Sequence, residues 1–92
     1  MDKQIQFVKF SFNSRLNDIP EPGTLEEAFP LVHRCLRRGD IVSIYGNNIL
    51  AILMGTDEKG GRVAAERIVN TYHAHYSYSE YEMSYEMTEI HG

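Results

Sequence analysis

The chain has one cysteine, no long apolar run and no excess of basic residues. With Cys35 alone, no intrachain disulfide can form, which suits a reducing compartment. No apolar stretch approaches the ~20 residues of a membrane span, and the start, Met1 to Gln4, has no signal-peptide pattern. We therefore expect a protein without a membrane partner.

A chain of 92 residues predicts one domain, residues 1–92. Hydrophobic residues make up 42% of the chain and charged residues 24%, which is ordinary for a globular domain. A chain of this size can build one sheet backed by helices, but it has too little core for a deep cavity.

The charge is negative overall and unevenly distributed. The net charge of −4 argues against nucleic-acid binding, which needs a basic face. Three basic residues cluster in one segment: Arg34, Arg37 and Arg38. Four acidic residues near the end have no nearby base: Glu80, Glu82, Glu86 and Glu89. The arginine cluster is typical either of a local anion site or of a solvated helix end.

The first third of the chain predicts a strand, a loop and a helix. Residues 5–12 place Val8, Phe10 and Phe12 on one face of a strand. Residues 13–23 are rich in loop formers.

The first helix has clear start and stop signals. Thr24 and Glu27 form a capping-box pattern. Apolar residues then recur at helical spacing: Leu25, Phe29, Val32 and Leu36. Pro30 predicts a kink or a later helix start, because proline deletes one helical hydrogen bond. Gly39 is a natural stop.

A hairpin and a second helix follow. Residues 40–45 and 49–54 are short apolar runs separated by Gly46-Asn47-Asn48, which predicts a β-hairpin. Either Thr56 or Asp57 can cap the second helix, whose apolar stripe comprises Ala65, Ile68 and Tyr72.

The last segment, residues 81–90, alternates like a half-buried strand. One face carries Tyr81, Met83, Tyr85 and Met87. The order strand, helix, strand, strand, helix, strand predicts an α+β fold of the ferredoxin-like βαββαβ type, with a four-stranded antiparallel sheet and two helices on one face.

Residues 37–54 resemble a known family in order and spacing. They contain R-x-x-D, a short strand, a turn at Gly46, Asn47, Asn48, Ile49 and Leu50, and then an apolar strand. Thr56-Asp57 followed by Ala65-Glu66-Arg67-Ile68 resembles a "TD…AERI" helix, and Asn17-Asp18 resembles an upstream N-D pair. This arrangement is similar to that of GGDEF (diguanylate cyclase) domains over about residues 5–72, in a shortened form.

The resemblance implies a domain without cyclase activity. The family's acidic side chains hold Mg²⁺ on the GTP phosphates. Lys9 and Ser11 occupy the corresponding first-strand positions here, while Asn48 and Ile49 replace the acidic pair of the turn. With these acids replaced, two-metal phosphoryl transfer has no ligands, and we expect neither an enzyme nor a metal or other cofactor.

The nucleotide-facing positions also depart from the family. Asn47 replaces the second glycine of the turn, where phosphates would approach the backbone. Asn17 corresponds to a guanine-contacting asparagine, but Thr24 stands where its aspartate partner would be.

A regulatory ligand site is what the resemblance leaves in place. Many GGDEF domains bind cyclic di-GMP at an R-x-x-D motif five residues before the signature turn. Arg37 and Asp40 have that spacing, and Arg67 stands where the family's helix often supplies a further arginine. Arginine presents a planar fork to phosphate and guanine, and a carboxylate accepts from guanine nitrogens. The same residues are also typical of a helix C-terminus followed by a turn.

Three functions therefore stay open at this point. The first, which the resemblance implies, is a catalytically inactive signalling domain of the bacterial cytoplasm. It would act through protein contacts gated by cyclic di-GMP, with a ligand-promoted dimer. The second is an interaction or dimerisation module without a nucleotide ligand, pairing through the edge of its acidic, tyrosine-rich last strand. The third is a small metal-binding domain. It would use His73 and His75 on an extended segment with His33, His91 or Cys35, although surface histidines also explain the pattern.

Overall fold

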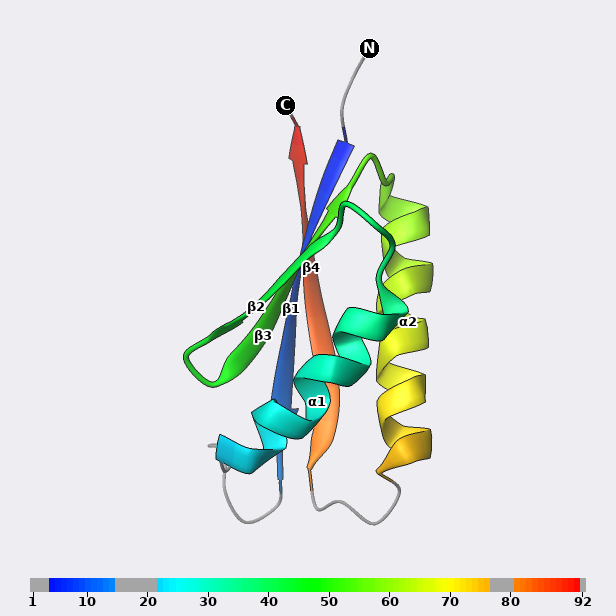
Figure 1. Cartoon of the computed structure of the whole chain (residues 1–92). Helices are drawn as coiled ribbons and strands as arrows, with labels where there is room; N and C mark the ends of the chain where they lie inside the picture. Colours follow the sequence, from blue (N-terminus) through cyan, green and yellow to red (C-terminus); the bar gives the residue numbers. More distant parts are fainter. Residues whose placement is uncertain (1–3, 15–21, 77–80, 92) are drawn as a thin grey trace.

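The computed structural model describes residues 4–14, 22–76 and 81–91. Six elements follow the predicted order (Figure 1): β1 (Gln4–Asn13), α1 (Pro22–Cys35), β2 (Ile41–Tyr45), β3 (Asn48–Met54), α2 (Glu58–His75) and β4 (Glu82–His91).

The four strands form one sheet in the order β2-β3-β1-β4, and all three neighbouring pairs are antiparallel. Both helices lie on the same side of this sheet (Figure 1). The predicted α+β, ferredoxin-like arrangement is therefore confirmed. Within the described residues, no helix is both long enough and apolar enough to span a membrane.

The core lies between the helices and one face of the sheet. The predicted inward face of β1, comprising Val8, Phe10 and Phe12, is buried. So is the predicted stripe of α2, comprising Ala65, Ile68 and Tyr72. Each large apolar side chain removed from water contributes about 1.5–3 kcal/mol to stability. The helices therefore pack on the face of the sheet where the alternating pattern places its apolar residues.

Helix α1 departs from its predicted bounds. It begins at Pro22, so Thr24 lies inside the first turn and does not cap the helix, and the later start expected from Pro30 is wrong. Proline at the first helical position has no amide that needs a partner. Pro30 is exposed within the helix. The buried positions of α1 are Leu25, Ala28, Leu31 and Val32, while Phe29 is half-buried at the margin. The helix ends at Cys35, so the stop expected at Gly39 comes too late and the half-buried Leu36 lies beyond the helix.

Helix α2 is capped by Asp57, whose carboxylate accepts from the Gly60 amide at 2.7 Å. Gly61 is buried where the helix meets the sheet. A Cβ built on it would lie 2.8 Å from both Gln6 Cγ and Met87 Sδ. Glycine at this position therefore allows close approach of α2 to β1 and β4.

The hairpin between β2 and β3 has the predicted two-strand form. Tyr45 pairs with Asn48, which leaves Gly46 and Asn47 as a two-residue turn. Gly46 has φ +59° and no other turn residue has positive φ. Glycine at the first central position is typical of a type II′ hairpin turn.

Strand β4 has the predicted alternation. Tyr81 and Met83 are buried, and Tyr85 and Met87 are partly buried against the core. The intervening positions of β4 face away from the helices.

Candidate functional site

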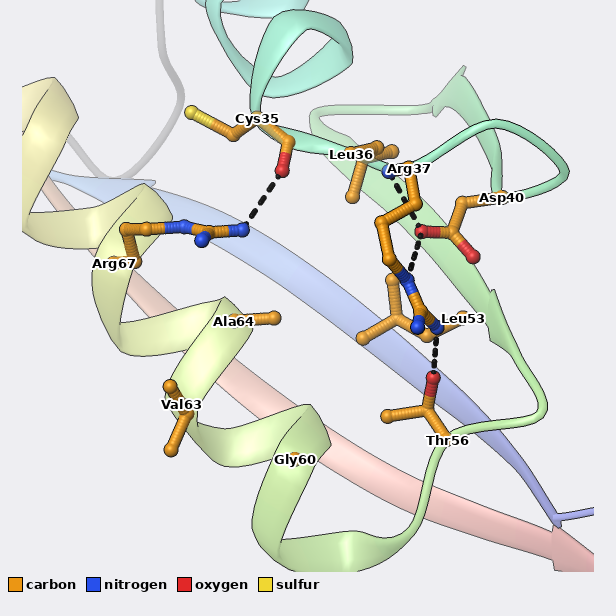
Figure 2. A pocket seen from close by; sticks show the side chains of 10 residues that line it. All are labelled: Cys35, Leu36, Arg37, Asp40, Leu53, Thr56, Gly60, Val63, Ala64 and Arg67. Carbon is orange, nitrogen blue, oxygen red and sulfur yellow. Dashed lines mark hydrogen bonds and ion pairs between the residues drawn. The ribbon is translucent and has the colours of Figure 1, made fainter.

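A cavity of about 190 Å³ lies where the end of α1, the end of β3 and the start of α2 meet (Figure 2). It is lined by Cys35, Leu36, Arg37, Asp40, Leu53, Thr56, Gly60, Val63, Ala64 and Arg67. The three predicted ligand-binding residues, Arg37, Asp40 and Arg67, are thus brought together from segments 27 residues apart in the sequence.

Asp40 connects the loop after α1 to the end of β3. One carboxylate oxygen accepts from the Arg37 backbone amide at 3.0 Å, and the other accepts from the Met54 amide at 3.1 Å. The side chain is only 4% exposed. Gly39, with φ +98°, allows the chain to turn just before it. Asp40 therefore closes the helix end and satisfies two backbone donors.

The Arg37 side chain extends from the loop towards the start of α2 (Figure 2). Its guanidinium donates to the Met54 carbonyl at 3.1 Å and to the Thr56 hydroxyl, and its Nε lies 3.7 Å from the Asp40 carboxylate. The side chain is 63% exposed, so the ion pair is screened by water.

Arg67 reaches from α2 to the opposite end of the cavity (Figure 2). Its guanidinium donates to the Cys35 carbonyl at 3.0 Å. Cys35 is the last residue of α1, where carbonyl groups lack helical partners and the dipole favours a cation. Arg67 therefore stabilises the end of α1 from a neighbouring helix.

The cavity has two arginines with apolar side chains between them. Leu53 and Ala64 lie between Arg37 and Arg67 (Figure 2). Each guanidinium has more donors than its contacts use. The site can therefore present planar donors and an apolar surface to a flat, acceptor-rich group, while every predicted residue also has a role within the fold.

Thr56 is the polar cavity residue that sequence reasoning did not assign to the site. The sequence predicts it as a possible helix cap and as part of the Thr56-Asp57 resemblance, yet its hydroxyl accepts from Arg37 and donates to the Met54 carbonyl at 3.1 Å. Its partner lies 19 residues earlier in the sequence, so no local spacing points to this contact.

At the turn resembling the GGDEF signature, Ser11 and Asn48 come together. Ser11 donates to the Asn48 side-chain oxygen at 3.1 Å. Lys9 lies two residues earlier on β1 and pairs across the sheet with Glu86 at 3.5 Å. Of the four glutamates expected to have no nearby base, Glu86 thus has one. A neutral hydrogen bond and a cation occupy the positions where the resemblance places metal-binding acids.

Ile49 and Leu50 point to opposite sides of the sheet. Ile49 is fully buried and Leu50 is half-buried on the face away from the helices. Since successive strand residues alternate, Ile49 cannot share a face with Asn48. Asn17, the expected guanine contact, lies outside the described residues.

The two histidines proposed for a metal site lie on α2, so the expectation of an extended segment is wrong. Residues two apart on a helix do not face each other. His73 is also half-buried and accepts from the Met83 amide at 3.1 Å, which corrects the expectation that it is a surface residue. Over residues 4–14, 22–76 and 81–91, no group of three metal-ligating side chains gathers.

Comparison with known proteins supports the fold alone. No protein-family model matches the chain, and no curated protein matches it. Among solved structures, the chain is similar to the crystal structure of PelD 158-CT from Pseudomonas aeruginosa PAO1, with a TM-score of 0.60 and 13% identity. The similarity covers 91% of this chain and 31% of that one, so the present chain spans about a third of its structural neighbour.

Proposed function

We propose that this domain is a catalytically inactive, GGDEF-like regulatory module that binds cyclic di-GMP at the cavity between Arg37 and Arg67. The observation that carries the proposal is the convergence of Arg37, Asp40 and Arg67 on one cavity. Their spacing from the turn that resembles the GGDEF signature is the spacing that the family resemblance predicts for such a site. Arginine forks suit both the phosphate oxygens and the guanine edge of such a ligand.

The absence of catalysis in this proposal rests on the signature turn. Metal-dependent phosphoryl transfer requires oxygen anions on the cation. The side chains on the relevant face are Ser11, Asn48 and Lys9, and Lys9 would repel Mg²⁺. Ile49 has no route to that face because it is buried in the core.

The size of the cavity specifies how the ligand would sit. Pockets that enclose drug-sized ligands measure roughly 300–1,000 Å³, and this cavity measures about 190 Å³. It would accept one base of the ligand, and the second half would remain open to another domain or a second copy. The proposal therefore includes a ligand that bridges two surfaces.

The test is thermal unfolding in a titration with cyclic di-GMP, with GTP–Mg²⁺ in parallel. At about 100 times the dissociation constant, the ligand adds about 2.7 kcal/mol of stability, or roughly 10 °C or more for a domain of this size. Arg67→Gln removes one guanidinium from the cavity and should abolish the shift. Arg38→Gln removes the same charge beside the cavity, which Arg38 does not line, and should retain it.

Two results would overturn this function. One is a melting temperature that does not change at millimolar cyclic di-GMP. The other is an equal shift in the Arg67→Gln and Arg38→Gln variants, which would place binding elsewhere. Consumption of GTP by the purified protein, lost in a variant of Ser11 or Asn48, would overturn the inactive assignment.

A further inference from the structure

Strand β2 forms an edge of the sheet with no charged residue on it. It pairs with β3 on one side only. Its sequence is Ile-Val-Ser-Ile-Tyr, and Ile41, Ile44 and Tyr45 are 54%, 45% and 71% exposed. Natural edges usually carry lysine, proline or a bulge that prevents pairing with another strand. This edge lacks lysine and proline and pairs with β3 in continuous register.

The opposite edge is β4, which differs in charge. It carries three glutamates, Glu82, Glu86 and Glu89. Two copies of β4 placed side by side would bring like charges together, which destabilises cross-strand pairing. Of the two edges, β2 is therefore the one whose composition permits pairing with itself.

The hairpin register shows which backbone groups of β2 face outwards. The pair that closes a two-residue turn, Tyr45 with Asn48, exchanges backbone hydrogen bonds within the hairpin. Hydrogen-bonded and non-hydrogen-bonded pairs alternate along an antiparallel ladder. Ser43 and Ile41 consequently bond to β3, and the amide and carbonyl groups of Val42 and Ile44 point away from the sheet.

We propose that the β2 edge binds the same edge of a second copy, in antiparallel register about a twofold axis at Ser43. In this register Val42 bonds to the partner's Ile44, and Ile44 bonds to the partner's Val42. This makes four backbone hydrogen bonds and joins the two sheets into one of eight strands. Such an interface is isologous, as twofold symmetry requires.

The side chains fit the same register. On the face away from the helices, Tyr45 would lie beside the partner's Ile41, so that the two most exposed apolar residues of β2 cover each other. On the helix-covered face, Ile44 would lie beside the partner's Val42. The proposal uses no residue of the arginine cavity, so it stands or fails independently of cyclic di-GMP.

The first experiment is sedimentation analysis of the full chain. A short edge-to-edge interface is small, and small interfaces are weak. The mass should therefore rise from 10.6 kDa towards twice that value between roughly 10 μM and 1 mM. Ser43→Lys and Ser43→Glu each place like charges at the axis and should remain monomeric, whereas their equimolar mixture should recover the dimer.

Ser84→Lys is the matched control. Ser84 is an exposed serine on β4, on the same face of the sheet as Ser43, so the variant should dimerise like the wild type. A wild-type chain that stays at monomer mass at 1 mM would overturn the proposal. A dimer that tolerates Ser43→Lys but is lost in Ser84→Lys would also overturn it and would assign the interface to β4.

Disulfide trapping tests the register itself. The two Ser43 residues would form a non-hydrogen-bonded pair with Cα atoms about 4.5 Å apart, within the usual disulfide range of roughly 4.4–6.8 Å. In a Cys35→Ser background, Ser43→Cys should cross-link on mild oxidation and Ser84→Cys should not. Equal cross-linking in both variants would indicate random collision and would contradict the register.

Discussion

Asp40→Ala should destabilise the free protein even though Asp40 belongs to the proposed ligand site. The carboxylate is almost completely buried and accepts from two backbone amides, those of Arg37 and Met54. Alanine removes the carboxylate, so both backbone amides lose their hydrogen-bond acceptor. The variant therefore tests whether this residue serves the fold before any ligand is present.

The expected magnitude follows from these contacts. A hydrogen bond to a charged group contributes about 1.5–3 kcal/mol. Both donors belong to exposed residues, so water replaces much of the loss and each of the two bonds accounts for only about 1 kcal/mol. The screened Arg37 ion pair adds less than about 1 kcal/mol. A total loss of about 2–3 kcal/mol corresponds to a fall in melting temperature of roughly 10–20 °C.

Urea denaturation followed by circular dichroism measures this change without ligand, and a domain of this size should unfold in one transition. Arg37→Ala is the control, because it removes the exposed partner of the same ion pair, together with its exposed hydrogen bonds to the Met54 carbonyl and the Thr56 hydroxyl, but leaves both Asp40 hydrogen bonds to backbone. It should cost about 1 kcal/mol or less. If Asp40→Ala costs no more than Arg37→Ala, Asp40 does not hold the loop and the structural argument is wrong.

The other two predictions concern core packing. Gly61→Ala should destabilise the domain by about 1–2 kcal/mol in urea denaturation, because the overpacking cost exceeds the gain in helix propensity. Gly23→Ala in α1, where a Cβ meets open space, should be neutral or stabilising, and equal effects would contradict the close approach of α2. Ile49→Glu should cost more than about 3 kcal/mol because it buries a charge in the core. Leu50→Glu, on the half-buried face where Leu50 pairs with Lys9, should cost clearly less. The reverse order would contradict the placement of Ile49 on the buried face of β3 and of Leu50 on the opposite face.

Much of the fold followed from periodicity. The alternation in β1 and β4 and the helical stripe of α2 identified buried residues correctly, because each pattern reports directly on which face meets the core. The start of α1 did not follow from such a pattern. Thr24 and Glu27 form a capping box by spacing alone, yet Pro22 begins the helix. Two acceptable start signals only two residues apart cannot be ranked without tertiary contacts.

The candidate site was only partly predictable. Arg37, Asp40 and Arg67 were found through their register against the signature turn, and the structure places them around one cavity. Their internal contacts could not be foreseen, because the partners are the main-chain groups of Met54 and Cys35. Every residue has the same backbone groups, so a hydrogen bond between a side chain and a remote backbone group leaves no local sequence motif.

These internal contacts change how a ligand would be bound. Arg67 already donates to the Cys35 carbonyl at the end of α1, so a ligand that recruits the same donors must displace that bond. Losing a hydrogen bond of this kind costs about 1 kcal/mol, which weakens binding roughly fivefold. The Asp40 contacts are stronger and more buried, so a ligand gains little by breaking them. Arg67 is therefore the residue at which binding and folding can be separated, whereas a substitution at Asp40 would lower ligand affinity through loss of the folded state.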